Sequence, residues 1–417
     1  MIRRILETAA LTAFVCVSRA DVHLHPLFTD HAVLQRGAPL PVWGWADHGE
    51  QVMVEFAGQK ATTTAVNGRW KVVLAPLPGS EQPQTMKVTG KNVVEVNDLL
   101  VGEVWVASGQ SNMEWPMHRT ENPEAEIQAS ANPMLRLFTV PKRKMPVPAE
   151  DIKSAWTNSG PESVRGFSAV AYYFGKDLQA SLKVPVGIIH TSWGGSPAEV
   201  WIREDLLKAD KAFTRDILDT RAEGMRKWAK ARATWEAERA AAQAEGKPFT
   251  KGAPSPGWQP SELYNGMIAP LLPFPIAGAI WYQGESNADR AWQYRSLFTT
   301  MIGNWRHDWR SGPFPFLLVQ LAPWDRNKKR SLEEITATPG DSAWAELREA
   351  QNYAAEVLDN VGVAVITDLG DKDDIHPTRK QPVGARLALL AREIAYGDKD
   401  RKSTRLNSSH VALSRMP

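Results

Sequence analysis

Apolar segments alternate with amphipathic helical patterns along the chain after residue 100, and this alternation restricts the fold more than any other feature. Stripes of apolar residues spaced by three or four positions predict helices at 170–182, 297–305 and 383–394. Short apolar runs between such stripes are typical of βαβ units with a parallel sheet. The predicted strands are 103–107, 186–190, 276–282, 316–321 and 361–367. We therefore expect an α/β domain over residues 99–397.

Residues 21–98 show a different pattern, in which short alternating segments are separated by glycine and proline. The pair Asn67-Gly68 between two of these segments is a strong signal for a tight β-hairpin. The pattern predicts a small all-β sandwich before the α/β domain. Its expected strands are 40–45, 51–56, 60–66, 70–74 and 84–89.

The first twenty residues resemble a secretory signal peptide. A basic start is followed by an apolar stretch and by small residues at Ser18 and Ala20. The single cysteine of the chain, Cys16, lies in this segment, so we expect no disulfide in the mature protein. We predict a secreted or periplasmic protein, with residues 1–20 removed.

Two further segments depart from the α/β pattern. Residues 204–246 are charged and alanine-rich, with Trp228 and Trp235 seven positions apart, and predict a helical insertion. Residues 398–417 lose the apolar periodicity and are rich in Ser, Arg and Lys, which is typical of a disordered and foreign tail.

The overall charge bears on partners. The formal net charge is only +2, and no long basic run is interleaved with aromatic residues, so we expect no binding to nucleic acid. No apolar run after residue 20 reaches the ~20 residues that span a bilayer, so we expect no membrane contact after signal cleavage. The sequence gives no indication of the oligomeric state.

Polar turns follow four of the predicted strands, at 109–113, 191–196, 283–287 and 371–377. In an open parallel sheet, ligands bind beyond the carboxyl ends of the strands. The first turn holds Ser111 and the last holds His376 with Asp373 and Asp374. A serine hydroxyl becomes a nucleophile when a histidine removes its proton and a carboxylate orients that histidine. We therefore predict a serine hydrolase site that needs no metal or other cofactor.

The middle two turns offer donors for a developing negative charge on a carbonyl oxygen. Candidates are a backbone N–H at Gly194 or Gly195, with Gly195 preferred, and the side-chain amides of Gln283 and Asn287. Each motif also has a structural alternative. Ser111 has the spacing of a helix N-cap with Glu114, and the two amides have positions suited to capping the following helix.

Four motifs together resemble those of the sialate O-acetylesterases, a branch of the SGNH hydrolases. They are Gly-Gln-Ser-Asn-Met at 109–113, Trp-Gly-Gly-Ser-Pro-Ala-Glu-Val-Trp at 193–201, Trp-Tyr-Gln-Gly-Glu-Ser-Asn at 281–287 and Asp-Ile-His-Pro at 374–377. The resemblance extends from about residue 25 to 397. It implies a three-layer α/β/α catalytic domain, with Ser111 as nucleophile, His376 as base, and Asp373 or Asp374 as the orienting acid.

The expected substrate is an O-acetylated sialic acid or a related acetylated carbohydrate. Trp193 is a candidate for stacking on a sugar ring, and Arg203 or Arg165 for pairing with a carboxylate. One alternative is an esterase acting on acetyl-xylan or another polysaccharide, and a second is a non-catalytic carbohydrate-binding protein. A metal site at His23 and His25 is the weakest hypothesis, because further ligands at metal-site spacing are lacking.

Overall fold

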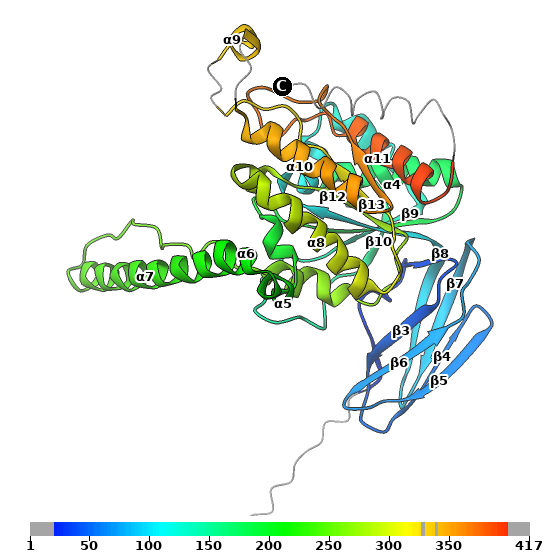
Figure 1. Ribbon diagram of the computed structural model, residues 1–417. Coiled ribbons are helices and arrows are strands. Elements are labelled where there is room, and N and C mark those ends of the chain that lie inside the picture. The colour runs from blue at the N-terminus through cyan, green and yellow to red at the C-terminus, as the bar shows by residue number, and fades with distance from the viewer. Residues whose placement is uncertain (1–20, 327–329, 338–340, 399–417) are drawn as a thin grey trace, which may run out of the picture.

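The computed structural model describes residues 21–326, 330–337 and 341–398, and its central feature is a twisted sheet (Figure 1). Its strands follow the order β10-β9-β11-β8-β12-β13-β14, parallel throughout except for antiparallel β10 at the edge. These strands are β8 (Val93–Gly109), β9 (Asn132–Thr139), β10 (Trp156–Ser159), β11 (Val186–Ser192), β12 (Gly278–Tyr282), β13 (Phe316–Val319) and β14 (Val361–Ala364).

The five strands predicted for this sheet are confirmed, whereas β9 and β10 were not predicted. In β9, Arg136 interrupts the apolar run, and its guanidinium is buried in an ion pair with Asp98. Strand β10 has only four residues, two of them exposed, so it carries little apolar signal. Both strands depend on contacts that local periodicity does not report.

Helices cover both faces of this sheet. On one face, α4 (Ala169–Leu182) and α11 (Gln381–Ile394) pack together, and Phe174 of α4 lies 5.1 Å from Trp105 between ring centres. On the other face, α8 (Ala291–Trp309) places Trp305 5.8 Å from Trp281, beside α10 (Ala343–Val357). Trp105 pairs with Gly278 on the neighbouring strand, and paired residues point to the same face. Side chains alternate between faces along a strand, so Trp281, three positions after Gly278, points to the face opposite Trp105. The result is a mixed α/β fold.

The N-terminal strands form one separate sheet, β1-β3-β6, and an extension of the central sheet through β2, β4, β5 and β7. At the predicted hairpin, Asn67 and Gly68 both have positive φ, 52° and 81°, as a type I′ turn requires. The 17-residue strand β8 crosses residue 98, so the division into two domains there stays a prediction. These strands are β1 (His23–Leu24), β2 (Val33–Gln35), β3 (Leu40–Trp45), β4 (Gln51–Phe56), β5 (Gln59–Thr64), β6 (Arg69–Leu74) and β7 (Ser80–Thr89).

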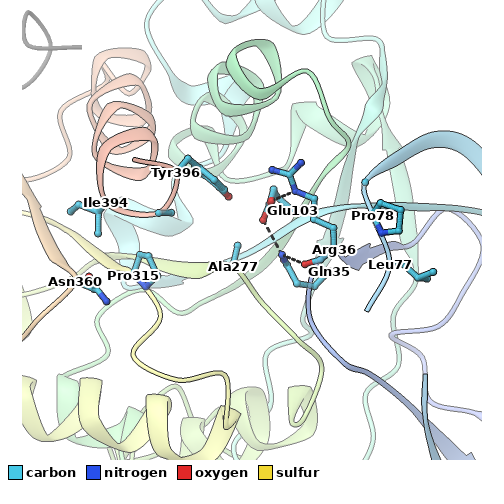
Figure 2. Close-up of a pocket in the computed structure, with 13 residues that line it drawn as sticks. Gln35, Arg36, Leu77, Pro78, Glu103, Ala277, Pro315, Asn360, Ile394 and Tyr396 are labelled. Atoms are coloured by element: carbon cyan, nitrogen blue, oxygen red, sulfur yellow. Dashed lines mark hydrogen bonds and ion pairs between the residues drawn. The ribbon is translucent and has the colours of Figure 1, made fainter. Parts of the chain in front are cut away.

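A cavity of about 710 Å³ lies beside Glu103 in the middle of β8, next to the residues that directly precede β12, β13 and β14 (Figure 2). Its buried carboxylate, Glu103, accepts a 2.9 Å hydrogen bond from Gln35 and pairs with Arg36. These polar groups satisfy one another. The cavity is also at the opposite edge of the sheet from the carboxyl ends, where ligands bind in folds of this type.

The insertion over residues 204–246 is helical, as expected. It contains α5 (Glu204–Ala209), α6 (Lys211–Phe213), the π-helix η3 (Thr214–Asp219) and α7 (Thr220–Ala244), and α7 projects away from the body (Figure 1). Trp228 and Trp235 lie on one side of α7 and donate hydrogen bonds to the carbonyls of Pro254 and Lys251, at 2.9 and 2.7 Å. Their spacing of seven therefore fastens the returning loop along the helix.

The remaining helical segments are short, and most lie in the connections between sheet and long helices. None of the helices in residues 21–326, 330–337 and 341–398 combines the length and apolar character needed to cross a bilayer. The predicted signal peptide and all but Asp398 of the predicted tail lie outside the described residues. The short segments are α1 (Ser111–Glu114), η1 (Met117–Arg119), α2 (Pro123–Gln128), α3 (Pro161–Arg165), η2 (Ala198–Trp201), η4 (Tyr264–Ile268), η5 (Ala269–Leu271), η6 (Glu285–Arg290) and α9 (Leu332–Ala337).

The turn at the end of β8 depends on Gly109. Its φ is +139°, and a Cβ at this position would lie 2.1 Å from the Tyr282 carbonyl oxygen on neighbouring β12. Gly109→Ala should therefore lower the free energy of unfolding by about 2 kcal/mol or more, measured by urea denaturation. Gly166→Ala is the control, because a Cβ there meets no atom within 4 Å. Equal stability of the two variants would contradict this account of the turn.

Candidate functional site

Two of the predicted turns meet at the carboxyl edge of the sheet. Ser111 begins α1 directly after β8, and His376 lies in the loop between β14 and α11. The Ser111 Oγ is 2.9 Å from His376 Nε2, which is a hydrogen-bond distance across 265 residues of sequence. The structure therefore brings together the two residues predicted as nucleophile and base.

Ser111 does not act as a helix cap. The N-cap of α1 is Gln110, and Ser111 is the first helical residue, so its hydroxyl is directed to His376. Glu114, the expected partner in a capping box, makes other contacts. One of its carboxylate oxygens accepts a 2.6 Å hydrogen bond from the Gly194 N–H, and the other pairs with Lys142.

The imidazole of His376 is held by a tryptophan and surrounded by charges. It stacks on Trp115 with 5.2 Å between ring centres, and Arg119 lies 4.1 Å from the same tryptophan ring. Partial burial lowers the pKa of His376, and the positive charges of Lys380 and Arg119 lower it further, while Asp374 opposes them. The ring therefore favours its neutral form, which is the form that accepts a proton.

The two candidate acids have different surroundings. Asp374 Oδ1 is 3.7 Å from His376 Nδ1 and accepts a 2.9 Å hydrogen bond from the His376 backbone N–H. Asp373 instead pairs with Lys372 at 2.5 Å. A separation of 3.7 Å is an ion-pair contact, too long for a hydrogen bond. Asp374 is thus the carboxylate next to the imidazole.

The second turn places Gly194 beside the serine. A Cβ on Gly194 would lie 3.3 Å from the Cβ of Ser111, so the two backbones approach closely. Gly195 has φ +75° and is exposed, and a Cβ added to it would meet no atom within 4 Å. Of the two glycines considered from the sequence, Gly194 is the one at the serine.

The third turn points into the protein interior. Gln283 donates to Asn287 Oδ1 at 2.7 Å and to the Ser196 carbonyl at 3.3 Å, and it accepts from the Tyr294 hydroxyl at 2.9 Å. Asn287 donates to Glu199 at 3.0 Å. Both amides are buried, and these bonds fasten η2 and η6 to each other. The structure therefore does not bring Gln283 or Asn287 to the Ser111 hydroxyl.

A pocket of about 340 Å³ opens above Ser111 and His376. Trp193 forms part of its wall and is partly exposed. The ring of Trp258 packs edge-on against Trp193, with 5.4 Å between ring centres. Arg203 is elsewhere, because it pairs with Asp205 and Asp308 and lines another cavity. The pocket is lined by Ser111, Glu114, Trp115, Pro116, Arg119, Lys142, Trp193, Gly194 and His376.

Several residues in the pocket or next to it were not predicted from the sequence. Arg119 and Lys142 supply positive charge at the pocket, whereas Arg165 pairs with Glu124 outside it. Trp258 comes from the end of the loop that returns from α7 and also contacts Lys144. For Arg119, the one clue in the sequence was its position eight residues after Ser111, which keeps it near the serine turn. No sequence pattern marks Trp258.

The histidines near the N-terminus have a structural explanation. His25 is fully buried against Trp43, and burial lowers its pKa to about 4. His23 is exposed on the short strand β1. Within the described residues, no group of three or more His, Cys, Asp or Glu side chains is arranged to hold a metal ion.

Comparison with known proteins agrees with the motifs. A family model described as carbohydrate esterase, sialic acid-specific acetylesterase, matches residues 249–391. The sialate O-acetylesterase of Rattus norvegicus is 31% identical over an alignment 404 residues long, which covers 86% of this chain and 70% of the rat protein. The human sialate O-acetylesterase is 29% identical, covering 89% and 70% of the two chains.

A solved crystal structure has a fold similar to that of this chain. The crystal structure of a carbohydrate acetylesterase from Xanthomonas citri matches with a TM-score of 0.75 and 37% sequence identity. The match covers 91% of this chain and 76% of the Xanthomonas chain.

Proposed function

Because this chain belongs to the sialate O-acetylesterase family, we propose that Ser111, His376 and Asp374 together hydrolyse an acetyl ester on a carbohydrate. The chain is a carboxylic ester hydrolase that acts on acetylated carbohydrate, so the interpretation as a non-catalytic binding protein is not retained. The observation that carries the proposed mechanism is the 2.9 Å separation of Ser111 Oγ and His376 Nε2 in an open pocket.

Hydrolysis proceeds in two steps in this proposal. His376 Nε2 takes the Ser111 proton while Ser111 Oγ attacks the acetyl carbonyl carbon, and the sugar oxygen then leaves with that proton. Water, activated by the same imidazole, attacks the acetyl-serine and releases acetate. Asp374 stabilises the charged imidazole through its contact with Nδ1.

The oxyanion of each tetrahedral intermediate needs donors beside Ser111. Gly194 is the glycine that lies next to Ser111, which supports a role for its N–H as a donor together with the Ser111 N–H. The Gly194 N–H donates a hydrogen bond to Glu114, whose other oxygen pairs with Lys142. We infer that Glu114 yields this N–H to the substrate and stays paired with Lys142.

Positive charge at the pocket favours an acidic sugar. Sialic acid carries a carboxylate, and Arg119 and Lys142 line the same pocket as Ser111. Trp193 and Trp115 offer apolar ring faces in the same pocket. An acetylated neutral polysaccharide remains the alternative substrate, because it needs the aromatic faces without the cations. Export of the protein is a separate proposal that rests on the signal-like residues 1–20.

Ser111→Ala should lower kcat on an aryl acetate by on the order of a millionfold, because it removes the attacking oxygen. Circular dichroism and thermal unfolding should match the wild type. Ser181→Ala, an exposed serine outside the pocket, serves as the control with normal turnover. Near-normal turnover by Ser111→Ala would rule out the mechanism.

Replacing each candidate acid separately identifies the one that assists His376. Asp374→Asn should lower kcat by at least a hundredfold, since the neutral amide no longer stabilises the imidazolium. Asp373→Asn is the matched control, because this carboxylate is paired with Lys372. A larger loss from Asp373→Asn than from Asp374→Asn would reverse the assignment.

The acidic-sugar proposal is tested by comparing substrates. Arg119→Leu should raise KM for O-acetylated sialic acid by about 10–100-fold relative to an aryl acetate, the loss expected for one charge-assisted hydrogen bond. Arg165→Leu, outside the pocket, should leave that ratio unchanged. If the wild type prefers acetyl-xylan, and Arg119→Leu affects both substrates equally, the neutral-polysaccharide alternative is correct.

A further inference from the structure

Behind His376 lies a cluster of polar side chains that the proposed mechanism does not use. It consists of Asn112 from α1, Glu285 from η6, and Lys380 just before α11. Lys380 is only 1% exposed and Asn112 only 2%. Burying a lysine is costly unless it has partners, so its position calls for an explanation.

Asn112 links the serine turn to the histidine loop. Its Nδ2 donates to the Ile375 carbonyl at 2.9 Å and to Glu285 at 2.6 Å. Ile375 directly precedes His376, and Asn112 directly follows Ser111. One amide side chain therefore fixes the backbone on both sides of the Ser111–His376 contact.

Lys380 completes this link by donating from Nζ to Asn112 Oδ1. Its ammonium lies 5.2 Å from the Tyr282 ring centre and 5.7 Å from that of Trp115, the ring on which His376 stacks. The bond uses the acceptor of Asn112, which leaves the amide hydrogens for Ile375 and Glu285. The lysine thereby selects the orientation of the amide that joins the two turns.

The charge of Lys380 also reaches His376. Burial lowers the pKa of Lys380 to about 7, while Glu285 and Asp374 raise it. Below pH 7 the lysine is therefore mostly charged, and this is the range in which a histidine ordinarily titrates. The charged groups that act on the imidazole are Lys380 and Arg119, which disfavour protonation, and Asp374, which favours it.

We propose that Lys380 is a positioning residue for His376, which orders Asn112 between the two turns and sets the pH range in which the imidazole acts as a base. This inference rests on the proposed function of Ser111 and His376. Asn112, Glu285 and Lys380 line no part of the pocket, so they support the reacting groups from behind.

The test is the pH dependence of kcat/KM for an aryl acetate. Lys380→Met removes both the charge and the hydrogen bond, and Lys380→Gln removes the charge but keeps a donor for Asn112. In both variants the acidic limb should move to higher pH by on the order of one unit, because a like charge near His376 is lost. Lys380→Arg should keep the wild-type limb. Arg379→Met is the control, since Arg379 is exposed and contacts Glu121 at 3.8 Å.

A direct titration of the His376 imidazole by NMR, assigned with His376→Asn, supplies a readout that needs no turnover. A higher pKa of His376 in Lys380→Gln supports the proposal. An acidic limb and a His376 titration that both stay at the wild-type position, with kcat/KM merely lowered at every pH, would overturn it. An active Ser111→Ala would instead overturn the proposed function, so the two failures are distinguishable.

Discussion

The contact between Ser111 and His376 depends on the histidine loop crossing the end of the sheet. Strands β12 and β13 lie between β8, which ends before Ser111, and β14, which leads to His376. At about 4.8 Å per strand, the loop spans roughly 14 Å to reach the serine. The hydrogen bonds from Asn112 to Ile375 and from Lys380 to Asn112 hold the loop there. The approach of Gly109 to Tyr282 and the close packing of Gly194 on Ser111 fix the serine side of the contact.

Much of this arrangement was predictable from the sequence, for a specific physical reason. Apolar runs report buried parallel strands, and the carboxyl ends of such strands share one edge, so Ser111 and His376 could be expected to meet. The amides of Gln283 and Asn287 were misleading as donors at the serine, because their partners, Ser196, Tyr294 and Glu199, come from other segments. The choice between Asp373 and Asp374 likewise depends on the loop backbone, which the spacing of the two residues does not specify. Arg203 and Arg119 are equally plausible by type, and only the fold shows that Asp205 and Asp308 neutralise the first.

Charge is distributed around the pocket in two layers. In the pocket, Arg119, Lys142 and Glu114 line the space next to Ser111, and Glu114 accepts a hydrogen bond from the Gly194 N–H. Behind the imidazole, Lys380 and Glu285 lie in a region without the screening of bulk water, where each charge has a larger effect on the pKa of its neighbours. Both layers bear on when His376 is basic, because Arg119 in the pocket and Lys380 behind the imidazole each lower its pKa.

The central claim is that the histidine loop makes Ser111 reactive, and covalent labelling tests it most directly. A fluorophosphonate probe reacts with a serine whose proton an adjacent base removes, and mass spectrometry of the digested protein identifies the labelled residue. The account predicts a single label on Ser111 in the wild type and greatly slowed labelling in a folded His376→Ala variant. Labelling of another serine, or labelling of Ser111 at the same rate without His376, would contradict it.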